Sequence, residues 1–260
     1  MRIIFFGDIV GKIGRKAVFE ILPKLKKEFK PELILANGEN LAHGKGVTMK
    51  IFEELTRQGI NLLTSGNHIW NQKEIYEIFE KDLPILRPAN WPLAPGKGYE
   101  VIKVGNFPVL VVNLMGRVFF REVLDCPFRE IDKILKNFAD LKTVIIDFHA
   151  EATSEKIAFG FYVDGRVSAV LGTHTHIPTS DAKILPQGTA YLTEVGMVGA
   201  KDSVIGVKKE PIIKSFLTQL PWQIEIPEHG EVVINAVFLE INPKTGKATK
   251  IERIEEEIYA

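Results

Sequence analysis

The sequence of 260 residues lacks the features that mark several classes of protein. A single cysteine, Cys126, has no partner for an internal disulfide bond, which excludes a disulfide-stapled scaffold. No apolar run approaches the roughly 20 residues that cross a bilayer, and the first residues have no signal-peptide pattern. The 33 basic and 33 acidic residues cancel, so the charge does not favour duplex nucleic acid or an anionic membrane as a partner. We therefore expect a soluble, cytoplasmic protein.

The composition that is present belongs to an ordinary globular protein. With 45% hydrophobic and 25% charged residues, the chain is not intrinsically disordered. Its length suits one large α/β domain or two small ones. It has no internal repeat, and the proline-rich segment 83–98, a long ordered loop or a small cap, is too short to link two domains. We expect a single domain over residues 1–260.

Short apolar runs alternate with amphipathic stretches, which predicts an α/β fold. The runs, several of them apolar at consecutive positions like strands covered on both faces, are 3–6, 33–36, 62–64, 109–114, 144–148 and 169–171. The expected helices are 17–29, 51–57, 75–79 and 127–138. Pro23 is expected to kink or split the first of them. Later runs predict antiparallel strands at 183–185, 191–193, 231–241 and 248–254.

Residues of metal-ligating types follow the apolar runs. They are Asp8, Glu39, Asn40, Asn67, His149, His174 and His176. The carboxyl ends of strands in an open α/β sheet form one edge, so these distant residues are expected to meet. Carboxylate, amide and imidazole donors without a thiolate suit Mn, Fe or Zn. The set exceeds the three or four ligands of one catalytic zinc, whereas two ions that share a bridging carboxylate would use all of it.

Each motif taken alone has an ordinary structural explanation. Asp8 after a glycine is most often a turn residue, and Asn67 carries no more weight. For His174 and His176, two positions apart, a shared ligand role and a structural role have about even odds. The joint pattern decides, because burying so many polar groups without a common ligand is unfavourable.

The order of these motifs resembles the five-block signature of the calcineurin-like metallophosphoesterases. The blocks are Gly7-Asp8, Gly38-Glu39-Asn40, Gly66-Asn67-His68, His149 and Gly172-x-His174-x-His176. The stretches closer to one branch, the bacterial YmdB-like proteins, are Asp8-Ile9-Val10-Gly11, Asn37-Gly38-Glu39-Asn40 and Gly66-Asn67-His68-Ile69-Trp70. The resemblance covers nearly the whole chain. It implies a layered α/β sandwich with mixed sheets and helices outside.

Three positions depart from the general superfamily pattern and match the YmdB-like branch. Val10 stands where a second ligand is usual, and Asn40 can take that place. Glu39 stands for the usual bridging aspartate, and Ile69 for an acid after the Asn-His pair. Without that acid His68 needs another partner, for which Asp181 or a backbone carbonyl is a candidate.

The resemblance implies two ion sites and a proton donor. The implied ligands of one ion are Asp8, Glu39, Asn40 and His176, and those of the other are Glu39, Asn67, His149 and His174. The ions, divalent or trivalent, are expected to be Fe or Mn, with Zn as a further candidate. The implied reaction is hydrolysis of a small phosphodiester, in particular a 2′,3′-cyclic nucleotide, by a hydroxide between the ions. His68 is the implied general acid.

Four further residues are weaker candidates for substrate contacts. His43 lies in a glycine-rich stretch that suits a phosphate, and Trp91 offers a ring on which a base stacks. Arg117 and Arg121 suit a bidentate phosphate contact. Ordinary surface roles explain each of them as well.

Two other functions stay open at this point. One is a regulatory protein that binds a nucleotide or a protein partner and hydrolyses only incidentally. The other is a metal-dependent amide hydrolase, which a single bound ion and inertness toward phosphoesters would indicate. A homo-oligomer is compatible with either.

Overall fold

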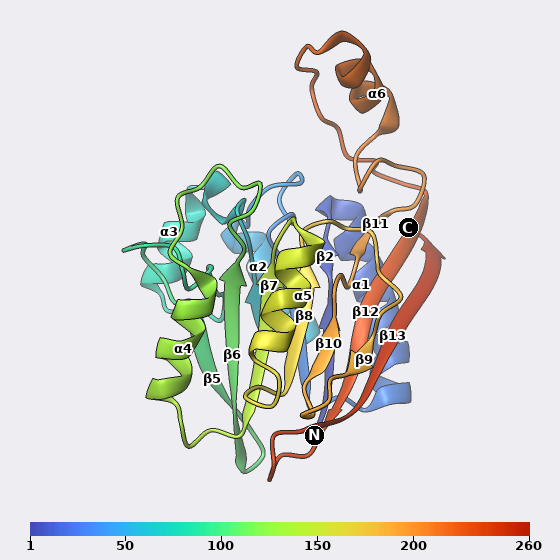
Figure 1. The fold of residues 1–260 in the computed structure, drawn as a ribbon. Helices are drawn as coiled ribbons and strands as arrows, with labels where there is room; N and C mark the ends of the chain where they lie inside the picture. Colours follow the sequence, from blue (N-terminus) through green and yellow to red (C-terminus); the bar gives the residue numbers. More distant parts are fainter.

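Two β-sheets pack face to face with helices on both outer sides in the computed structural model, which describes residues 1–260 (Figure 1). The strands are β1 (Arg2–Phe6), β2 (Asp8–Ile9), β3 (Leu33–Asn37), β4 (Leu62–Thr64), β5 (Tyr99–Val104), β6 (Phe107–Met115), β7 (Thr143–His149), β8 (Ala169–Thr173), β9 (Lys183–Ile184), β10 (Ala190–Leu192), β11 (Met197–Ala200), β12 (Glu231–Ile241) and β13 (Ala248–Tyr259). The helices are α1 (Gly11–Phe29), α2 (Met49–Gln58), α3 (Glu74–Glu80), α4 (Pro127–Asn137), α5 (Thr153–Tyr162) and α6 (Lys209–Thr218), with a short 3-10 helix η1 (Ile69–Asn71).

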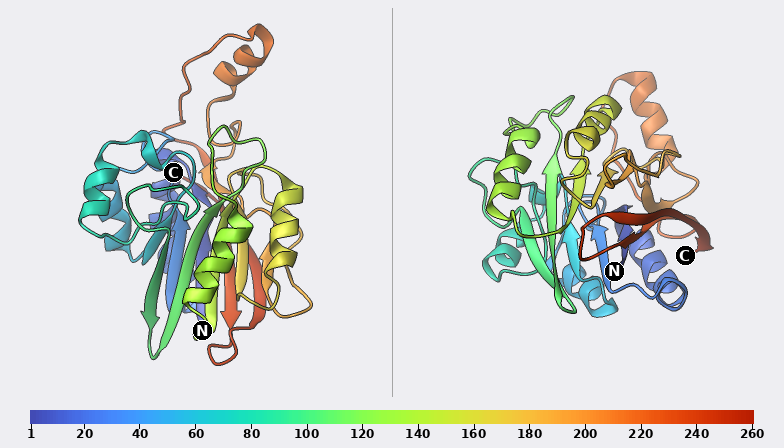
Figure 2. Two further views of the ribbon diagram at one scale, coloured as in Figure 1. Left: turned by 60° about the vertical axis from the view of Figure 1, so that its left-hand side comes forward. Right: turned by 60° about the horizontal axis from the view of Figure 1, so that its bottom comes forward.

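Both sheets are mixed. One has the order β2-β11-β12-β1-β3-β4, with β13 also paired to β12, and the other has the order β5-β6-β7-β8-β10-β9. Within them β1, β3 and β4 run parallel, as do β6, β7 and β8. Figure 2 shows the two sheets from other sides, with their parallel strands finishing at the same end of the molecule.

The consecutive apolar residues of the first strand reflect burial on both faces. Side chains alternate along a strand, so Ile3 and Phe5 join the core between the sheets while Ile4 and Phe6 join the core under α1 and α2. A third core lies between the second sheet and helices α4 and α5. The fold therefore has four layers, and the predicted α/β sandwich with mixed sheets and helices outside is confirmed.

Two expected features are wrong. The run 191–193 is expected to be antiparallel, but β10 extends the parallel order of β7 and β8 and is antiparallel only to the two-residue β9. The first helix begins at Gly11, earlier than expected, and continues through Pro23 as a single helix. Proline removes one backbone hydrogen bond, but Ile21, Leu22 and Leu25 around it are buried against the sheet. This packing holds the helix together across the missing bond.

An arm of residues 209–222 extends away from the sheets and carries α6 (Figure 1). The helix has no buried residue, and Phe216 and Leu217 on it are largely exposed. No helix of the fold has both the length and the apolar composition needed to cross a membrane.

Candidate metal centre

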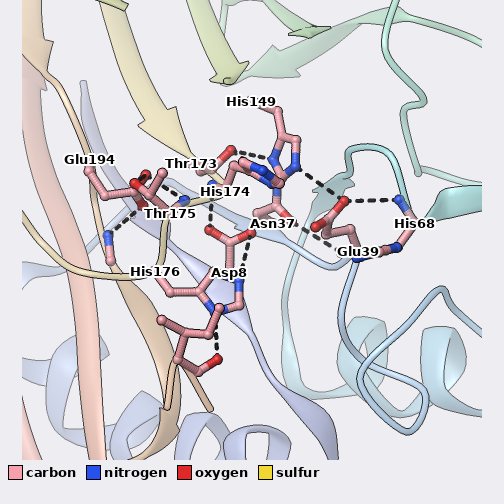
Figure 3. A network of polar contacts seen from close by, with 12 residues as sticks. Asp8, Asn37, Glu39, His68, His149, Thr173, His174, Thr175, His176 and Glu194 are labelled. Atoms are coloured by element: carbon pink, nitrogen blue, oxygen red, sulfur yellow. Dashed lines mark hydrogen bonds and ion pairs between the residues drawn. The ribbon is translucent and has the colours of Figure 1, made fainter. Parts of the chain in front are cut away.

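The expected ligands meet where the parallel strands of both sheets end. Asp8 opens β2 directly after β1, Glu39 and Asn40 follow β3, and Asn67 follows β4. From the second sheet, His149 ends β7, and His174 and His176 follow β8. Figure 3 shows Asp8, Glu39, His149, His174 and His176 gathered about one centre.

One half of the site is a cluster of Glu39, Asn67, His149 and His174. Ligand atoms of Glu39, His149 and His174 all lie within 4.8 Å of one another. His149 Nε2 lies 3.2 Å from Glu39 Oε2 and 3.3 Å from Asn67 Oδ1. Gly66 permits this approach, because a Cβ there would collide with the side chains of His149 and Glu39. These are the four residues expected around one ion.

The other half contains acceptor oxygens without donors. Asp8 Oδ1 lies 3.8 Å from His176 Nε2 and has no hydrogen-bond partner, and Asn40 Oδ1 is also buried without a partner. Buried acceptors left unpaired are unfavourable, and a metal cation satisfies them. The donor set therefore fits a metal ion at each half. Glu39 belongs to the first half, and its charge also acts on the pKa of Asp8 in the second.

The ionisable groups of the centre are buried together, and their pKa values depart from the usual ones. Burial raises the pKa of Asp8 to about 7. Burial alone would lower the pKa of His149, but the Glu39 carboxylate raises it to about 9, and His149 in turn lowers the pKa of Glu39 to about 2 against the effect of its own burial. Burial, together with the nearby charge of His149, lowers the pKa of His174 to about 3. A bound cation would displace the protons that the raised pKa values of Asp8 and His149 retain.

A buried polar network orients His149. Its Nδ1 lies 2.8 Å from Thr173 Oγ1, and Thr173 Oγ1 donates to Asp147 Oδ1 at 2.7 Å. Asn37 Nδ2 and Thr64 Oγ1 donate to the other oxygen of Asp147. Because the Thr173 hydroxyl donates to Asp147, it accepts the Nδ1 proton of His149, which leaves Nε2 facing the site.

His174 and His176 each have one ring nitrogen fixed from outside the site. His174 Nε2 lies 2.9 Å from Glu151 Oε2, and His176 Nδ1 lies 2.8 Å from the backbone carbonyl of Ile205. Both contacts are donations from the ring, so Nδ1 of His174 and Nε2 of His176 are left as possible ligand atoms. Both histidines have positive φ angles, 99° and 65°, which residues other than glycine rarely adopt.

An ion pair beneath this strained turn holds it in place. Glu194 Oε2 accepts from the backbone N–H of Thr175 at 3.1 Å and from its hydroxyl at 2.6 Å. The same oxygen lies 2.7 Å from Lys156 Nζ, and the two side chains are 1% and 2% exposed. Thr175 stands between the two histidines, so this buried pair fixes the backbone that carries both.

His68 lies beside the cluster. Its backbone N–H donates to Glu39 Oε2 at 3.2 Å, and its Nδ1 lies 3.3 Å from Asn71 Oδ1. Burial lowers the pKa of the ring below its usual value. Asp181, a candidate partner in the sequence, accepts from Thr179 and Thr193 instead, so that expectation is wrong.

The weaker substrate candidates lie in separate places. His43 lines a hollow of about 430 Å³ with Lys12 and residues 223–228. The ring of Trp91 packs edge-on against Trp70, with the ring centres 5.5 Å apart. The side chains of Arg117 and Arg121 are exposed.

Sequence reasoning missed the residues that support the ligands. Asp147 interrupts an apolar strand, and this signal was available. Glu151, Lys156 and Glu194 gave none, because their partners are distant in the sequence and their helix or turn looks ordinary. Phe120, whose ring centre lies 4.8 Å from that of His174, was missed for the same reason.

Comparison with known proteins identifies the family of this chain. The model of the YmdB-like protein family matches residues 4–254. The chain belongs to the YmdB-like family. It is 48% identical to a protein of Bacillus subtilis named 2′,3′-cyclic-nucleotide 2′-phosphodiesterase, over 98% of this chain and 96% of the relative. A Mycoplasma genitalium relative, named as a phosphatase/phosphodiesterase, is 38% identical over 98% of this chain and 92% of its own.

Three solved structures have the same fold. A protein from Thermus thermophilus superposes with a TM-score of 0.93 at 41% identity, covering 99% of both chains. A structure described as a phosphatase from Mycoplasma pneumoniae gives a TM-score of 0.94 at 36% identity, covering 99% of this chain and 93% of its own. A Staphylococcus aureus structure titled as a 5′-nucleotidase, at 14% identity and a TM-score of 0.61, shares the fold.

Proposed function

We propose that this chain is a phosphodiesterase with two metal ions that hydrolyses small phosphodiesters, 2′,3′-cyclic nucleotides in particular. The cluster of Glu39, His149 and His174, with unpaired buried oxygens on Asp8 and Asn40, carries the proposal. The names of the Bacillus subtilis and Mycoplasma genitalium relatives support the reaction class.

The ligands divide into two groups about Glu39. Asp8, Asn40 and His176 would hold one ion together with Glu39, and Asn67, His149 and His174 would hold the other. The absence of a thiolate suits Fe or Mn, and Zn is a further candidate. When bound, two ions supply an activated water as nucleophile and balance the charge of the phosphate.

His68 has the position of a proton donor. Asn71 accepts the Nδ1 proton of the ring, so Nε2 is left for the substrate. Water adds to phosphorus and releases one proton to solvent, the bond from phosphorus to one ribose oxygen breaks, and His68 gives its Nε2 proton to that oxygen. The product is a nucleoside monophosphate, and the neutral His68 regains a proton from solvent.

The charge around the centre suits a diester. A cyclic diester carries one negative charge, whereas a monoester carries two and calls for more cationic partners. Lys156, the lysine beneath the histidine turn, is already neutralised by Glu194. The formal net charge of the chain is zero.

Steady-state kinetics on matched substrates tests the proposal. The metal-loaded protein is expected to show a higher kcat/KM for a 2′,3′-cyclic nucleotide than for the 2′- or 3′-monophosphate of the same nucleoside. The reverse order would replace the diesterase by a phosphatase. Metal binding without hydrolysis of either would favour the regulatory alternative.

A further inference from the structure

The loop 116–124, between β6 and α4, has no regular structure, yet both of its ends are fixed. Asn90, which is buried, donates through Nδ2 to the carbonyls of Met115 and Asp125, at 2.9 Å each. Its Oδ1 accepts from the N–H of Met115 at 2.9 Å. One side chain thus joins the residues on either side of the loop.

Three further hydrogen bonds fix the loop against the candidate metal centre. Gly116 N–H donates to the carbonyl of His149 at 3.0 Å. Glu155 of α5 accepts from the N–H groups of Arg117 at 3.0 Å and Val118 at 3.1 Å. The loop is therefore anchored to the backbone of a candidate ligand, and Figure 1 shows it at the end where β7 and β8 finish.

The loop places the ring of Phe120 at the centre. The ring centre of Phe120 lies 4.8 Å from that of His174 and 6.4 Å from that of His149. Phe119 beside it is 82% exposed and has a φ of 69°, a region that a bulky residue rarely adopts. A strained, exposed phenylalanine on an anchored loop needs a reason, and such strain gathers at ligand-binding sites.

We infer that the loop 116–124 forms the wall that receives the base of the nucleotide, with Phe119 and Phe120 as its stacking surface. Bases stack on aromatic side chains with little regard to sequence. The anchors on Asn90 and Glu155 order the loop before the substrate arrives, which reduces the entropy lost on binding. The inference rests on the proposed function. It adds that the loop favours phosphodiesters that carry a base over those that lack one.

Trp91, the aromatic candidate from the sequence, is placed less favourably than Phe120 for stacking on the base of a substrate. Its ring packs on Trp70 in a hollow of about 300 Å³ that Tyr76, Pro92, Ala94 and Pro95 complete. Its one aromatic contact is therefore with Trp70, whereas Phe120 contacts the imidazoles of two candidate ligands.

Two cyclic phosphate esters test the inference on the metal-loaded protein. One is 2′,3′-cyclic AMP, and the other is glycerol 1,2-cyclic phosphate, which has the same five-membered ester and no base. Phe119→Ala and Phe120→Leu are expected to lower kcat/KM for the nucleotide about 5- to 100-fold, chiefly through KM. The base-free ester should change less than about twofold. The affinity for a nucleoside 3′-monophosphate, measured by calorimetry, should fall by a similar factor.

Val123→Ala, at another exposed apolar position of the loop, and Trp91→Leu are the controls. Equal losses on both esters, no loss on either, or a base-dependent loss in Trp91→Leu alone would overturn the inference. If Phe120→Leu loses metal, the result for Phe119→Ala is the deciding one, because the exposed Phe119 ring packs on no other ring. A wild type inactive on both esters would instead overturn the proposed function, and the inference with it.

Discussion

Replacing Lys156 with methionine should destabilise the protein more than any surface change, because it leaves Glu194 charged and buried. The two groups lie 2.7 Å apart and are 2% and 1% exposed, so solvent screens them little. Methionine keeps most of the apolar stem but removes the cation. Breaking a buried ion pair by removing one partner costs about 3–5 kcal/mol.

Urea denaturation of the metal-free protein measures this loss, and a thermal scan should show a melting temperature about 6 to 20 °C lower. The double variant Lys156→Met/Glu194→Gln is the control. Its glutamine carbonyl can still accept from Thr175, and no charge is buried, so it should recover most of the stability lost by Lys156→Met alone. A loss below about 1 kcal/mol for Lys156→Met, or a double variant as unstable as the sum of the single ones, would refute the reasoning.

Four further outcomes are expected. Glu39→Ala should lose more bound metal than Asn40→Ala when both are measured by elemental analysis, because Glu39 is proposed to contact both ions; equal losses would contradict a bridge. His68→Ala should keep its metal and lose about 10²- to 10⁴-fold in kcat on nucleotides, but less on aryl esters whose leaving group needs no proton; the same loss on both would remove the proton-donor role. Metal affinity should rise between pH 6 and 9 with release of protons, because in the metal-free protein the pKa of His149 is about 9 and that of Asp8 about 7. The same raised pKa means that the stabilisation from protonated His149 is complete below about pH 6.5 and is lost as pH rises through about 9, which denaturation at a series of pH values will show.

Much of the fold follows from local pattern. The run at residues 3–6 predicted a strand with both faces buried, and Ile4 and Phe5 do lie in different cores. The edge strand β5 was not predicted, because it is only half-buried and pairs along one side. Helix α6 has no buried face, so no apolar stripe marked it.

The ligands of the candidate site could be predicted from the sequence, but the contacts that orient them could not. The seven ligands follow apolar strands, and parallel strands bring their ends together. The contacts that orient them, such as Glu194 on Thr175 or Thr173 on His149, join residues 19 to 24 positions apart through the packing of turns. No local pattern encodes such contacts, so they required the structure.

The most direct test of the two-ion centre is anomalous scattering from metal-loaded crystals. Two ions about 3.5 to 4 Å apart are expected, with Glu39 between them. Asp8, Asn40 and His176 should contact one ion, and Asn67, His149 and His174 the other. A single ion, with Asn67 and His149 turned away from it, would contradict the account.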